Sequence, residues 1–380
     1  MKILLIGEYS RLHNSLKEGL QNLGHEVTLI SYGDGMKQYP SDILLKSKIN
    51  KNKLLRKINN LSIRVFKKDF IKVEFKNHLK KIRHQLIGYD VVQLINEDAL
   101  NLTPKDSINF LNFIVNKNKK MFLLVCGEDY TTISFFLKGN NGHSALTPLI
   151  ENPKLKSRYS FSLKYISKPY KKLHNYIYQH INGVICSDID YSRIFKNKNS
   201  FLGLIPNPIN VDKLEYIPLK TDGKINIFHG INSHSSIKKG SKFFTEALSI
   251  IKKKYGDKIN IIETTNLPYK EYINIYNNAH ILLDQVYAYD QGFNALEAMA
   301  KGKVVFTGAD QEWLDHYNLE EDTVAINALP DVNYLVEKLE WLINNPDQIQ
   351  NISKNARQFI EAHHHYKEVA KKYLATWQSN

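Results

Sequence analysis

Residues 2–30 read KILLIGEYSRLHNSLKEGLQNLGHEVTLI and contain one complete strand–helix–strand unit. Lys2–Ile6 is a short apolar strand that ends at Gly7, and a helix with leucines at helical spacing follows it. Gly24 ends that helix, and His25–Ile30 forms the next strand. This order of elements predicts two parallel strands joined by a right-handed crossover, so the start of the chain favours an α/β fold.

The same alternation of apolar strands and amphipathic helices continues along the chain. In the first half, further strands are predicted at Asp90–Ile95, Met121–Val125 and Gly183–Ser187. In the second half, strands are predicted at Lys224–Phe228, Lys258–Ile262, His280–Asp284 and Lys303–Phe306, with helices at Gly240–Lys254, Pro268–Asn277 and Phe293–Ala300. From Asp331 onward the spacing of the apolar residues predicts helices.

The two halves of this pattern are separated by Ile205-Pro206-Asn207-Pro208-Ile209-Asn210. Two prolines that flank one asparagine prevent a regular element and favour extended geometry. At 380 residues the chain is also longer than one hydrophobic core usually allows. We therefore expect two doubly wound, parallel-sheet domains, residues 1–205 and 206–362, with a cleft where the strands of both sheets end.

The net charge of +14 lies almost wholly in the first half of the chain. Residues 46–84 contain fourteen Lys and Arg but two acidic residues, whereas residues 221–380 contain seventeen basic and twenty acidic residues. This basic insertion is either a solvated helical face or the contact for an anionic membrane, a phosphorylated acceptor or a nucleic acid. Anionic lipid attracts clustered basic residues by about 1 kcal/mol each, so a membrane surface is favoured. No nucleic-acid motif accompanies the charge, and we expect no such partner.

The cysteines and the lengths of the apolar runs indicate the cellular compartment in which the protein works. Cys126 and Cys186 each end an apolar run, which favours small buried residues over a disulfide framework. The first apolar run is shorter than a signal peptide requires, and no run approaches the roughly 20 apolar residues of a membrane helix. We therefore expect a cytoplasmic protein that is at most peripheral on the inner face of the plasma membrane.

The strongest local signal is the stretch from Tyr289 to Val305, YDQGFNALEAMAKGKVV. A loop with one glycine, Gly292, leads into a short helix, and a second glycine ends that helix before the next strand. Backbone amides at such a helix N-terminus can bind a phosphate. Glu297 lies one turn inside the helix, where it can reach the hydroxyls of a ribose. The alternative is an ordinary packed helix.

This stretch resembles the donor-site motif of GT-B-fold glycosyltransferases, especially the retaining family 4 (glycosyl transferases group 1). The match is most selective through Leu296-Glu297-Ala298-Met299-Ala300 and Gly302. The resemblance implies that Glu297 binds the nucleotide ribose, and that Gln291, Gly292, Phe293 and Asn294 present amides to the donor sugar and diphosphate. It also implies the GT-B fold, in which two Rossmann-like domains are joined by a C-terminal helix, here residues 363–380, that packs back on the N-terminal domain.

One position departs from the family motif, which has two glutamates eight positions apart. The residue eight before Glu297 is Tyr289, and the nearest acid is Asp290. Asp290 could replace the missing glutamate through a shifted loop. Because that glutamate contacts the donor sugar in the family, the identity of the sugar and the retention of anomeric configuration both stay open.

A second polar stretch, FHGINSHSSIKKG, runs from Phe228 to Gly240. A strand is predicted to end at Gly230, and a polar loop then leads to two lysines. Preorganised cations and amides of this kind stabilise a diphosphate leaving group, although solvated lysines at a helix start are the alternative. The family has a lysine before the second glycine, which implies that Lys239 is the catalytic cation. The family's arginine after the first glycine is missing, so Lys238, Asn232 or Ser233 could supplement the charge, and Gly230 is expected beside them at the donor site.

Two further segments follow the same resemblance. Residues 205–212 resemble the family's interdomain hinge. Thr265, Asn266 and Leu267 occupy the place where the family holds the nucleobase, largely through backbone contacts.

Polar residues at strand ends are candidates for the acceptor side of the cleft. Glu8 and His13 follow the first strand, and Glu128 and Asp129 follow the strand that ends at Cys126. A catalytic base could sit at these positions, although each residue can instead be a helix cap or a surface group. Glu128 and Asp129 are favoured because Gly127 lets the chain turn directly into the cleft.

Two spacings that suggest a metal site have simpler explanations. Asp188 and Asp190 lie between a strand and a helix, where capping accounts for them. His363, His364 and His365 point in three directions on a helix. We expect neither a metal nor a cofactor, because the protein itself supplies the positive charge.

Together these features predict a metal-independent glycosyltransferase of bacterial-type surface polysaccharide or glycoconjugate synthesis. It would transfer a sugar from a nucleoside-diphosphate sugar, UDP-sugar in preference to GDP-sugar, to a glycan or lipid-linked acceptor. The alternatives are another enzyme on the same fold, such as a sugar-nucleotide epimerase or a phosphorylase, and a non-catalytic protein that only binds nucleotide sugars.

Overall fold

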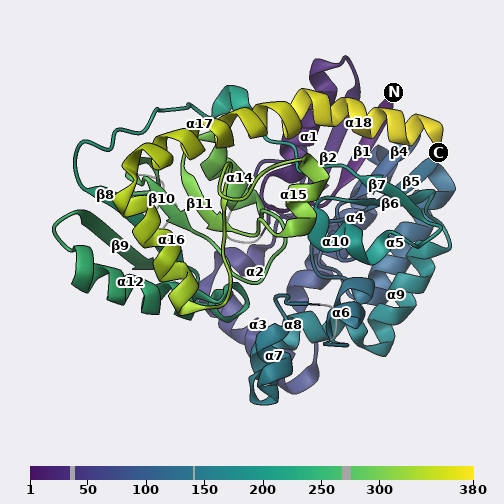
Figure 1. Ribbon diagram of the computed structural model, residues 1–380. Coiled ribbons are helices and arrows are strands. Elements are labelled where there is room, and N and C mark those ends of the chain that lie inside the picture. The colour runs from purple at the N-terminus through teal and green to yellow at the C-terminus, as the bar shows by residue number, and fades with distance from the viewer. Residues whose placement is uncertain (35–38, 140–141, 268–274) are drawn as a thin grey trace.

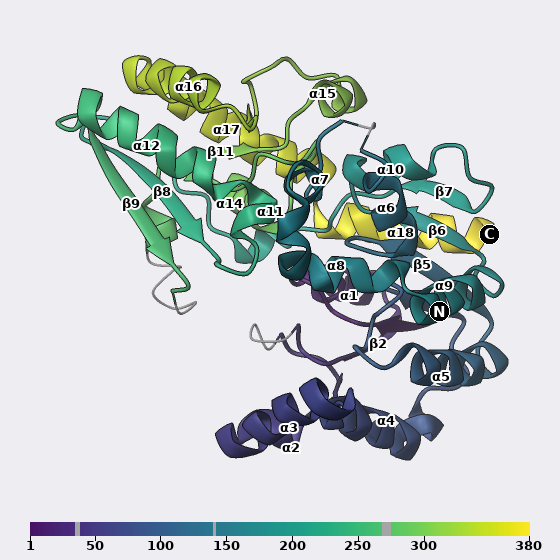
Figure 2. The same cartoon turned by 90° about the horizontal axis from the view of Figure 1, so that it is seen from below.

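The computed structural model describes residues 1–34, 39–139, 142–267 and 275–380, which form two parallel β-sheets flanked by helices (Figures 1 and 2). The strand order is β3-β2-β1-β4-β5-β6-β7 in the seven-stranded sheet and β12-β11-β10-β8-β9 in the five-stranded sheet. The chain starts at an inner strand of each sheet, β1 or β8, and continues on both sides of it, so the predicted pair of doubly wound α/β sheets is confirmed.

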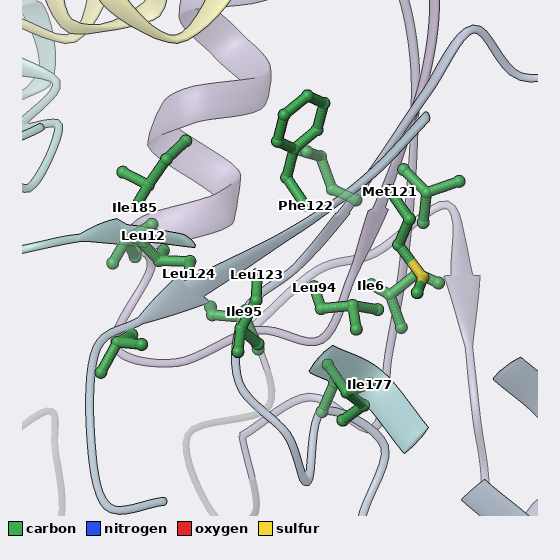
Figure 3. Packing of buried hydrophobic residues seen from close by; sticks show 14 of the residues in the cluster. Ile6, Leu12, Leu94, Ile95, Met121, Phe122, Leu123, Leu124, Ile177 and Ile185 are labelled. Atoms are coloured by element: carbon green, nitrogen blue, oxygen red, sulfur yellow. The ribbon is translucent and has the colours of Figure 1, made fainter. Parts of the chain in front are cut away.

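The seven-stranded sheet uses residues from the first half of the chain. Its strands are β1 (Lys2–Ile6), β2 (Glu26–Ser31), β3 (Ile43–Leu44), β4 (Val91–Leu94), β5 (Lys120–Val125), β6 (Gly183–Cys186) and β7 (Phe201–Leu204). The helices between them are α1 (Leu12–Asn22), α5 (Pro104–Lys117), α6 (Tyr130–Phe136), α9 (Lys168–Tyr178) and α10 (Ile189–Phe195). Apart from Gln93 in β4 and the lysine that begins each of β1 and β5, the central strands are apolar because helices cover both faces of the sheet, as the packing around Leu94 and Phe122 illustrates (Figure 3).

Two insertions interrupt this sheet. The basic one forms α2 (Lys48–Lys51), α3 (Lys53–Phe66) and α4 (Phe70–Ile82). The other contains the short helices α7 (Thr147–Glu151) and α8 (Ser160–Leu163), with a 3₁₀ segment at Pro153–Tyr159 between them. In Figure 2 the basic insertion lies along one edge of the molecule, whereas α7 and α8 lie between the two sheets.

The five-stranded sheet uses residues from the second half. Its strands are β8 (Ile225–Ile231), β9 (Ile259–Thr265), β10 (Ile281–Leu283), β11 (Val304–Thr307) and β12 (Ile326–Asn327). Its helices are α11 (Ser236–Lys239), α12 (Ser241–Tyr255), α14 (Phe293–Ala300), α15 (Gln311–Tyr317), α16 (Val332–Asn344) and α17 (Pro346–His363).

The chain passes between the domains twice, and the two passages lie side by side. The Ile209 amide donates to the carbonyl of His364 over 2.7 Å, and the Tyr366 amide donates back to the Ile209 carbonyl over 3.1 Å. The last helix, α18 (Tyr366–Ser379), then packs along α1 (Figure 1). A Cβ on Gly19 of α1 would lie 2.4 Å from the Tyr366 carbonyl, so glycine permits this close approach. The C-terminal helix therefore crosses back as expected.

Some elements differ from the sequence-based expectation. The short edge strands β3 and β7 were not expected, and β8 continues through Gly230 to Ile231. The expected helix at Pro268–Asn277 falls largely outside the described residues. Within the described ranges, no helix is both long and apolar enough to cross a bilayer.

Candidate active site

The lysine turn after β8 and the start of α14 face each other across one buried carboxylate. Lys239 Nζ lies 2.7 Å from Oδ1 of Asp284, which directly follows β10. The same oxygen accepts a hydrogen bond of 3.3 Å from the side-chain amide of Asn294, in the first turn of α14. Asp284 is almost fully buried, whereas about a third of the Lys239 side chain is exposed. Two segments that are 55 residues apart in sequence therefore form one site, in which a lysine has access to solvent.

The turn that carries Lys239 depends on Gly240. Gly240 has φ of +68°, and a Cβ at this position would lie 2.3 Å from Val286 Cγ2. Glycine therefore allows α11 to end and α12 to start in close contact with the loop that follows β10. The Val286 amide donates to the Lys239 carbonyl over 3.0 Å, which fixes the lysine against the loop that also holds Asp284.

The N-terminus of α14 has no side-chain cap. Gly292 is the N-cap, and it has no side chain that could bond the first amides of the helix. It has φ of −72°, and among the described residues a Cβ there would meet only Gln285 Nε2, at 3.9 Å. Amides at such a helix start, with the positive end of the helix dipole, favour a phosphate group.

A valine at position 292 is therefore expected to leave the fold intact but to obstruct the helix N-terminus. We predict that Gly292→Val shifts the thermal midpoint of unfolding little, and weakens nucleotide-sugar binding by roughly 10–100-fold, the loss of one or more hydrogen bonds to a charged group. Isothermal titration with a nucleotide sugar checks this. Gly223→Val, at an open position before β8, is the matched control. Unaltered donor affinity in Gly292→Val would contradict the assignment.

The other predicted residues of the lysine loop are held in specific contacts. Gly230 lies within β8 rather than after it, which corrects the expected strand end. Asn232 accepts the His234 amide over 3.0 Å and so closes the loop. Asn266, in the left-handed conformation at φ of 53°, accepts the Ser233 amide over 3.0 Å. The loop after β8 is thus tied to the loop after β9, in which Leu267 also lies, and Thr265 is the last residue of β9.

Lys238 and Glu128 form an ion pair between the two domains. Lys238 Nζ lies 2.5 Å from Glu128 Oε1 and 2.6 Å from Ser162 Oγ. Arg158 adds a hydrogen bond of 3.0 Å to the carbonyl of Ser233. The α7–α8 insertion therefore closes over the lysine loop. Glu128 lies beside that loop, as its position after β5 predicted, whereas Arg158 and Ser162 have no sequence signal that identifies them.

Glu297 lines a cavity of about 240 Å³ between the domains. The N-terminal domain contributes Arg11 and Ser15, the linker contributes Asn210 and Lys213, and α14 contributes Phe293 beside Glu297. Ser10 and Arg11 have φ of 50° and 73°, a conformation that costs of order 1 kcal/mol or more per residue. This strained turn brings Arg11 to the cavity, and Arg11 was not among the predicted site residues.

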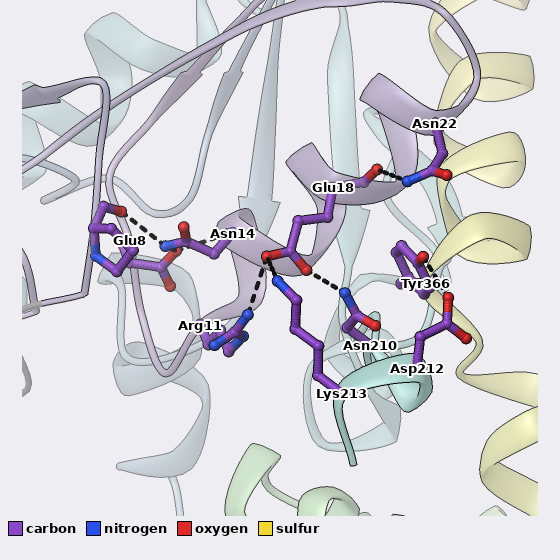
Figure 4. A network of polar contacts seen from close by, with 10 residues as sticks. Glu8, Arg11, Asn14, Glu18, Asn22, Asn210, Asp212, Lys213 and Tyr366 are labelled. Atoms are coloured by element: carbon purple, nitrogen blue, oxygen red, sulfur yellow. Dashed lines mark hydrogen bonds and ion pairs between the residues drawn. The ribbon is translucent and has the colours of Figure 1, made fainter. Parts of the chain in front are cut away.

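A polar network holds one wall of this cavity (Figure 4). Glu18 of α1 accepts hydrogen bonds from Arg11 over 3.0 Å and from Lys213 over 2.5 Å, and also pairs with Asn210. These hydrogen bonds connect the linker to α1. They also hold Arg11 and Lys213 where a ligand in the cavity would contact them.

Asp290 does not face the donor side, which corrects its assignment as a substitute for the family glutamate. Its carboxylate accepts the amides of Ile189 over 2.9 Å and Gln291 over 2.6 Å. The Gln291 amide is thus occupied, and the Gln291 side chain donates to the Gly308 carbonyl.

Asp188 caps α10 by accepting the Tyr191 amide, as expected. Among the described residues, no group of three His, Cys, Asp or Glu side chains could hold a metal.

Asp190, Asp290 and Tyr289 form an interdomain contact. Asp190 accepts the amides of Tyr289 and Asp290 over 3.1 Å each. The Tyr289 ring stacks on His143 at 4.5 Å between ring centroids, and the Arg193 guanidinium lies 3.8 Å from its centroid. The position that holds a glutamate in the family motif thus holds an aromatic interdomain contact here.

These buried acids predict a pH-dependent stability. Burial, reinforced by the charge of Asp290, raises the pKa of Asp190 to about 7, and burial raises the pKa of Asp290 to about 6. A folded-state pKa above the unfolded value stabilises the protein in acid, and this stabilisation disappears as the pH rises through 6–7. We expect the thermal midpoint to fall between pH 5 and pH 8, and Asp190→Asn to reduce that fall. Asp257→Asn, at an exposed site, is the control, and an unchanged pH profile in Asp190→Asn would contradict the prediction.

Three of the predicted acceptor-side residues are buried in local contacts. Glu8 accepts the Asn14 amide over 2.8 Å, and burial raises its pKa to about 8. His13 bonds the Gly7 carbonyl through Nδ1, and burial lowers its pKa to about 3. Asp129 caps α6 in a capping box with Thr132, which corrects its assignment as a catalytic base. Glu128 remains the better placed carboxylate.

The strand end after β4 carries polar residues that were not predicted. Glu97 Oε1 lies 2.6 Å from His174 Nδ1, and Asp98 Oδ2 lies 2.7 Å from Lys164 Nζ. Burial raises the pKa of Glu97 to about 8 and lowers that of His174 to about 4, which favours an uncharged pair. The rule that selected Glu128, a polar residue directly after a parallel strand, would also have selected Glu97 and Asp98.

The comparisons with known proteins agree with this architecture. Residues 234–375 match the family described as "Glycosyl transferase-like". No curated protein matches the chain. Similar solved structures include sucrose-phosphate synthase from Thermosynechococcus elongatus, with a TM-score of 0.57, 12% identity, and coverage of 100% of this chain and 99% of that one. Anabaena HepE in complex with UDP and glucose has a TM-score of 0.60, 11% identity and full coverage of both chains. A glycosyltransferase from Rickettsia africae has a TM-score of 0.53, 15% identity, and coverage of 99% and 97%.

The matched region begins within the lysine loop and includes Lys239, Asp284 and all of α14. The protein therefore has the GT-B fold, and the part of its second half that matches the glycosyl transferase-like model contains the contact between Lys239, Asp284 and α14.

Proposed function

We propose that the protein transfers a sugar from a nucleoside-diphosphate sugar, UDP-sugar in preference to GDP-sugar, to a glycan or lipid-linked acceptor. The observation that carries this proposal is the contact of Lys239 and Asn294 with the single carboxylate of Asp284. It brings a cation and a helix N-terminus without a side-chain cap to one site, the combination that a diphosphate leaving group requires. The UDP preference is supported by the fold's likeness to HepE, which binds UDP and glucose.

In the proposed reaction the bond between the anomeric carbon and the diphosphate oxygen breaks, and its electron pair stays on the diphosphate. Lys239 and the first amides of α14 stabilise the charge that develops there, so a metal is not required. The acceptor hydroxyl attacks the anomeric carbon and loses its proton. Glu128 lies beside the lysine loop, where its carboxylate is paired with Lys238. A bound diphosphate would compete for Lys238 and release that carboxylate, so Glu128 is our candidate to take the proton.

The same proposal covers how the donor is bound and where in the cell the protein works. Glu297 would bind the ribose in the interdomain cavity, with the nucleobase near Thr265, Asn266 and Leu267. Closure about the linker would exclude water and limit hydrolysis of the donor. The family resemblance favours retention of anomeric configuration and a role in surface polysaccharide or glycoconjugate synthesis. The protein would work in the cytoplasm, at an anionic membrane contacted by residues 46–84, where a lipid-linked acceptor resides.

A thermal-shift panel of UDP-, GDP-, ADP- and dTDP-sugars tests the proposal. We expect stabilisation by UDP-sugars above the others, and a smaller stabilisation in Lys239→Ala but not in Lys242→Ala, an exposed lysine on the next helix. Product analysis with and without added acceptor then separates transfer from epimerisation. Stabilisation without any product would favour a protein that only binds nucleotide sugars, and no stabilisation by any donor would refute the proposal.

A further inference from the structure

Helix α3 buries two polar residues and exposes its apolar residues. Its buried residues are Asn59 and Ser62. Asn59 donates to Asp69 over 3.1 Å and accepts the Phe70 amide over 2.8 Å, and Ser62 donates to the Lys68 carbonyl over 2.9 Å. Polar contacts to the turn before α4 therefore fix the orientation of the helix.

Another side of α3, about 100° around the helix axis from Asn59 and Ser62, exposes a stripe of apolar side chains at helical spacing. The stripe consists of Leu54, Ile58, Leu61 and Val65, which are 66%, 51%, 60% and 60% exposed. Successive members are separated by three or four residues, so they share one face of the helix. Apolar residues with this spacing normally face a core, but here they are exposed to solvent, on a helix that lies at the edge of the molecule (Figure 2).

Cationic side chains border this stripe. At 100° per residue, Lys53, Lys57 and Arg64 lie along one flank of the stripe, and all three are exposed. Residues 46–68 contain nine Lys and Arg and no acidic residue. A contiguous apolar face next to unopposed positive charge complements an anionic lipid surface, which offers both negative headgroups and an apolar layer beneath them. A nucleic acid or a phosphorylated peptide would satisfy the charge but not the apolar stripe.

We infer that the exposed stripe of α3 inserts into the interface of an anionic bilayer, with Lys53, Lys57 and Arg64 on the headgroups. The insertion orients the N-terminal domain on the membrane. This inference narrows the proposed membrane contact to one helix face and does not depend on the transferase reaction.

Co-sedimentation with vesicles tests this inference. The vesicles consist of phosphatidylcholine alone, or of phosphatidylcholine and phosphatidylglycerol in equal parts. The full chain should bind the anionic vesicles and bind the neutral ones much more weakly. Ile58→Gln with Leu61→Gln should weaken anionic-vesicle binding by roughly tenfold or more per side chain, because less apolar surface is buried. Lys53→Glu with Lys57→Glu should weaken it by roughly fivefold or more per reversed charge.

Matched controls lie in the other domain. Ile217 is 52% exposed, so Ile217→Gln removes an equally exposed isoleucine, and Lys252→Glu with Lys253→Glu reverses two exposed lysines of α12. Neither control should alter vesicle binding, and all variants should keep the thermal midpoint and the donor-induced shift. Vesicle binding that survives Ile58→Gln with Leu61→Gln would overturn the inference. So would self-association of the full chain, without vesicles, that the same variant abolishes, because a second copy would then cover the stripe.

Discussion

Replacing Lys239 with alanine is expected to lower kcat by roughly 10²–10³-fold, the usual effect of removing one preorganised group that stabilises transition-state charge. Lys239 is held against Asp284, on the same oxygen that Asn294 bonds, so the cation is already positioned beside α14. The KM for the donor should rise much less than kcat falls, because the charge on the diphosphate grows as the glycosidic bond breaks. Steady-state kinetics with the best nucleotide sugar checks this.

Two comparisons separate this effect from loss of structure. Lys239→Arg keeps a cation beside Asp284 and should keep more activity than Lys239→Ala, whereas Lys242→Ala should match the wild type. Lys239→Ala also leaves the buried Asp284 without its ion pair, so the thermal midpoint of each variant must be measured beside kcat. A wild-type kcat in Lys239→Ala would contradict the proposed role.

Replacing Trp377 with alanine should produce the largest loss of stability. The indole is fully buried in the N-terminal core, near Phe122 and Tyr373, and its Nε1 donates to Gln93 Oε1 over 2.9 Å. The expected destabilisation is about 3–5 kcal/mol, because a large cavity forms. It also leaves Gln93, in the middle of β4, without this partner. Urea unfolding monitored by far-ultraviolet circular dichroism measures the loss.

Trp377→Phe serves as the conservative comparison, because it keeps most of the packing and removes only the indole donor. Its loss of stability should be clearly smaller than that of Trp377→Ala. If Trp377→Ala unfolds at the urea concentration of the wild type, α18 does not stabilise the N-terminal domain as described.

The repeated units of the fold could be predicted because they obey local rules. The apolar run at Lys2–Ile6 and the helix at Phe293–Ala300 have the predicted bounds, since strand runs and glycine stops are set by neighbouring residues. The edge strands β3 and β7 escaped prediction. β3 has two residues and β7 contains a glycine, so neither produces a distinct apolar run.

The candidate site was predictable only in part. Lys239, Gly292, Asn294 and Glu297 lie in two recognisable motifs, and the structure brings these motifs to Asp284 and the interdomain cavity. The orientation of Asp290 could not be predicted, because its partner Ile189 is 101 residues away. The Lys238–Glu128 pair likewise joins residues 110 positions apart, and such pairings depend on how the domains meet.

The exposed apolar side of α3 could not be predicted from the sequence either. The charge of residues 46–84 is evident in the sequence and indicated an anionic partner. The leucines and isoleucines of α3, however, have the spacing of a core-facing helix. The structure shows instead that Asn59 and Ser62 are buried and that the apolar stripe is exposed.

A crystal structure of the complex with UDP tests the central claim most directly. We predict that the β-phosphate lies within hydrogen-bond distance of Lys239 Nζ and of the first backbone amides of α14, with the ribose hydroxyls at Glu297. UDP bound elsewhere, with its phosphates remote from both Lys239 and α14, would contradict the account.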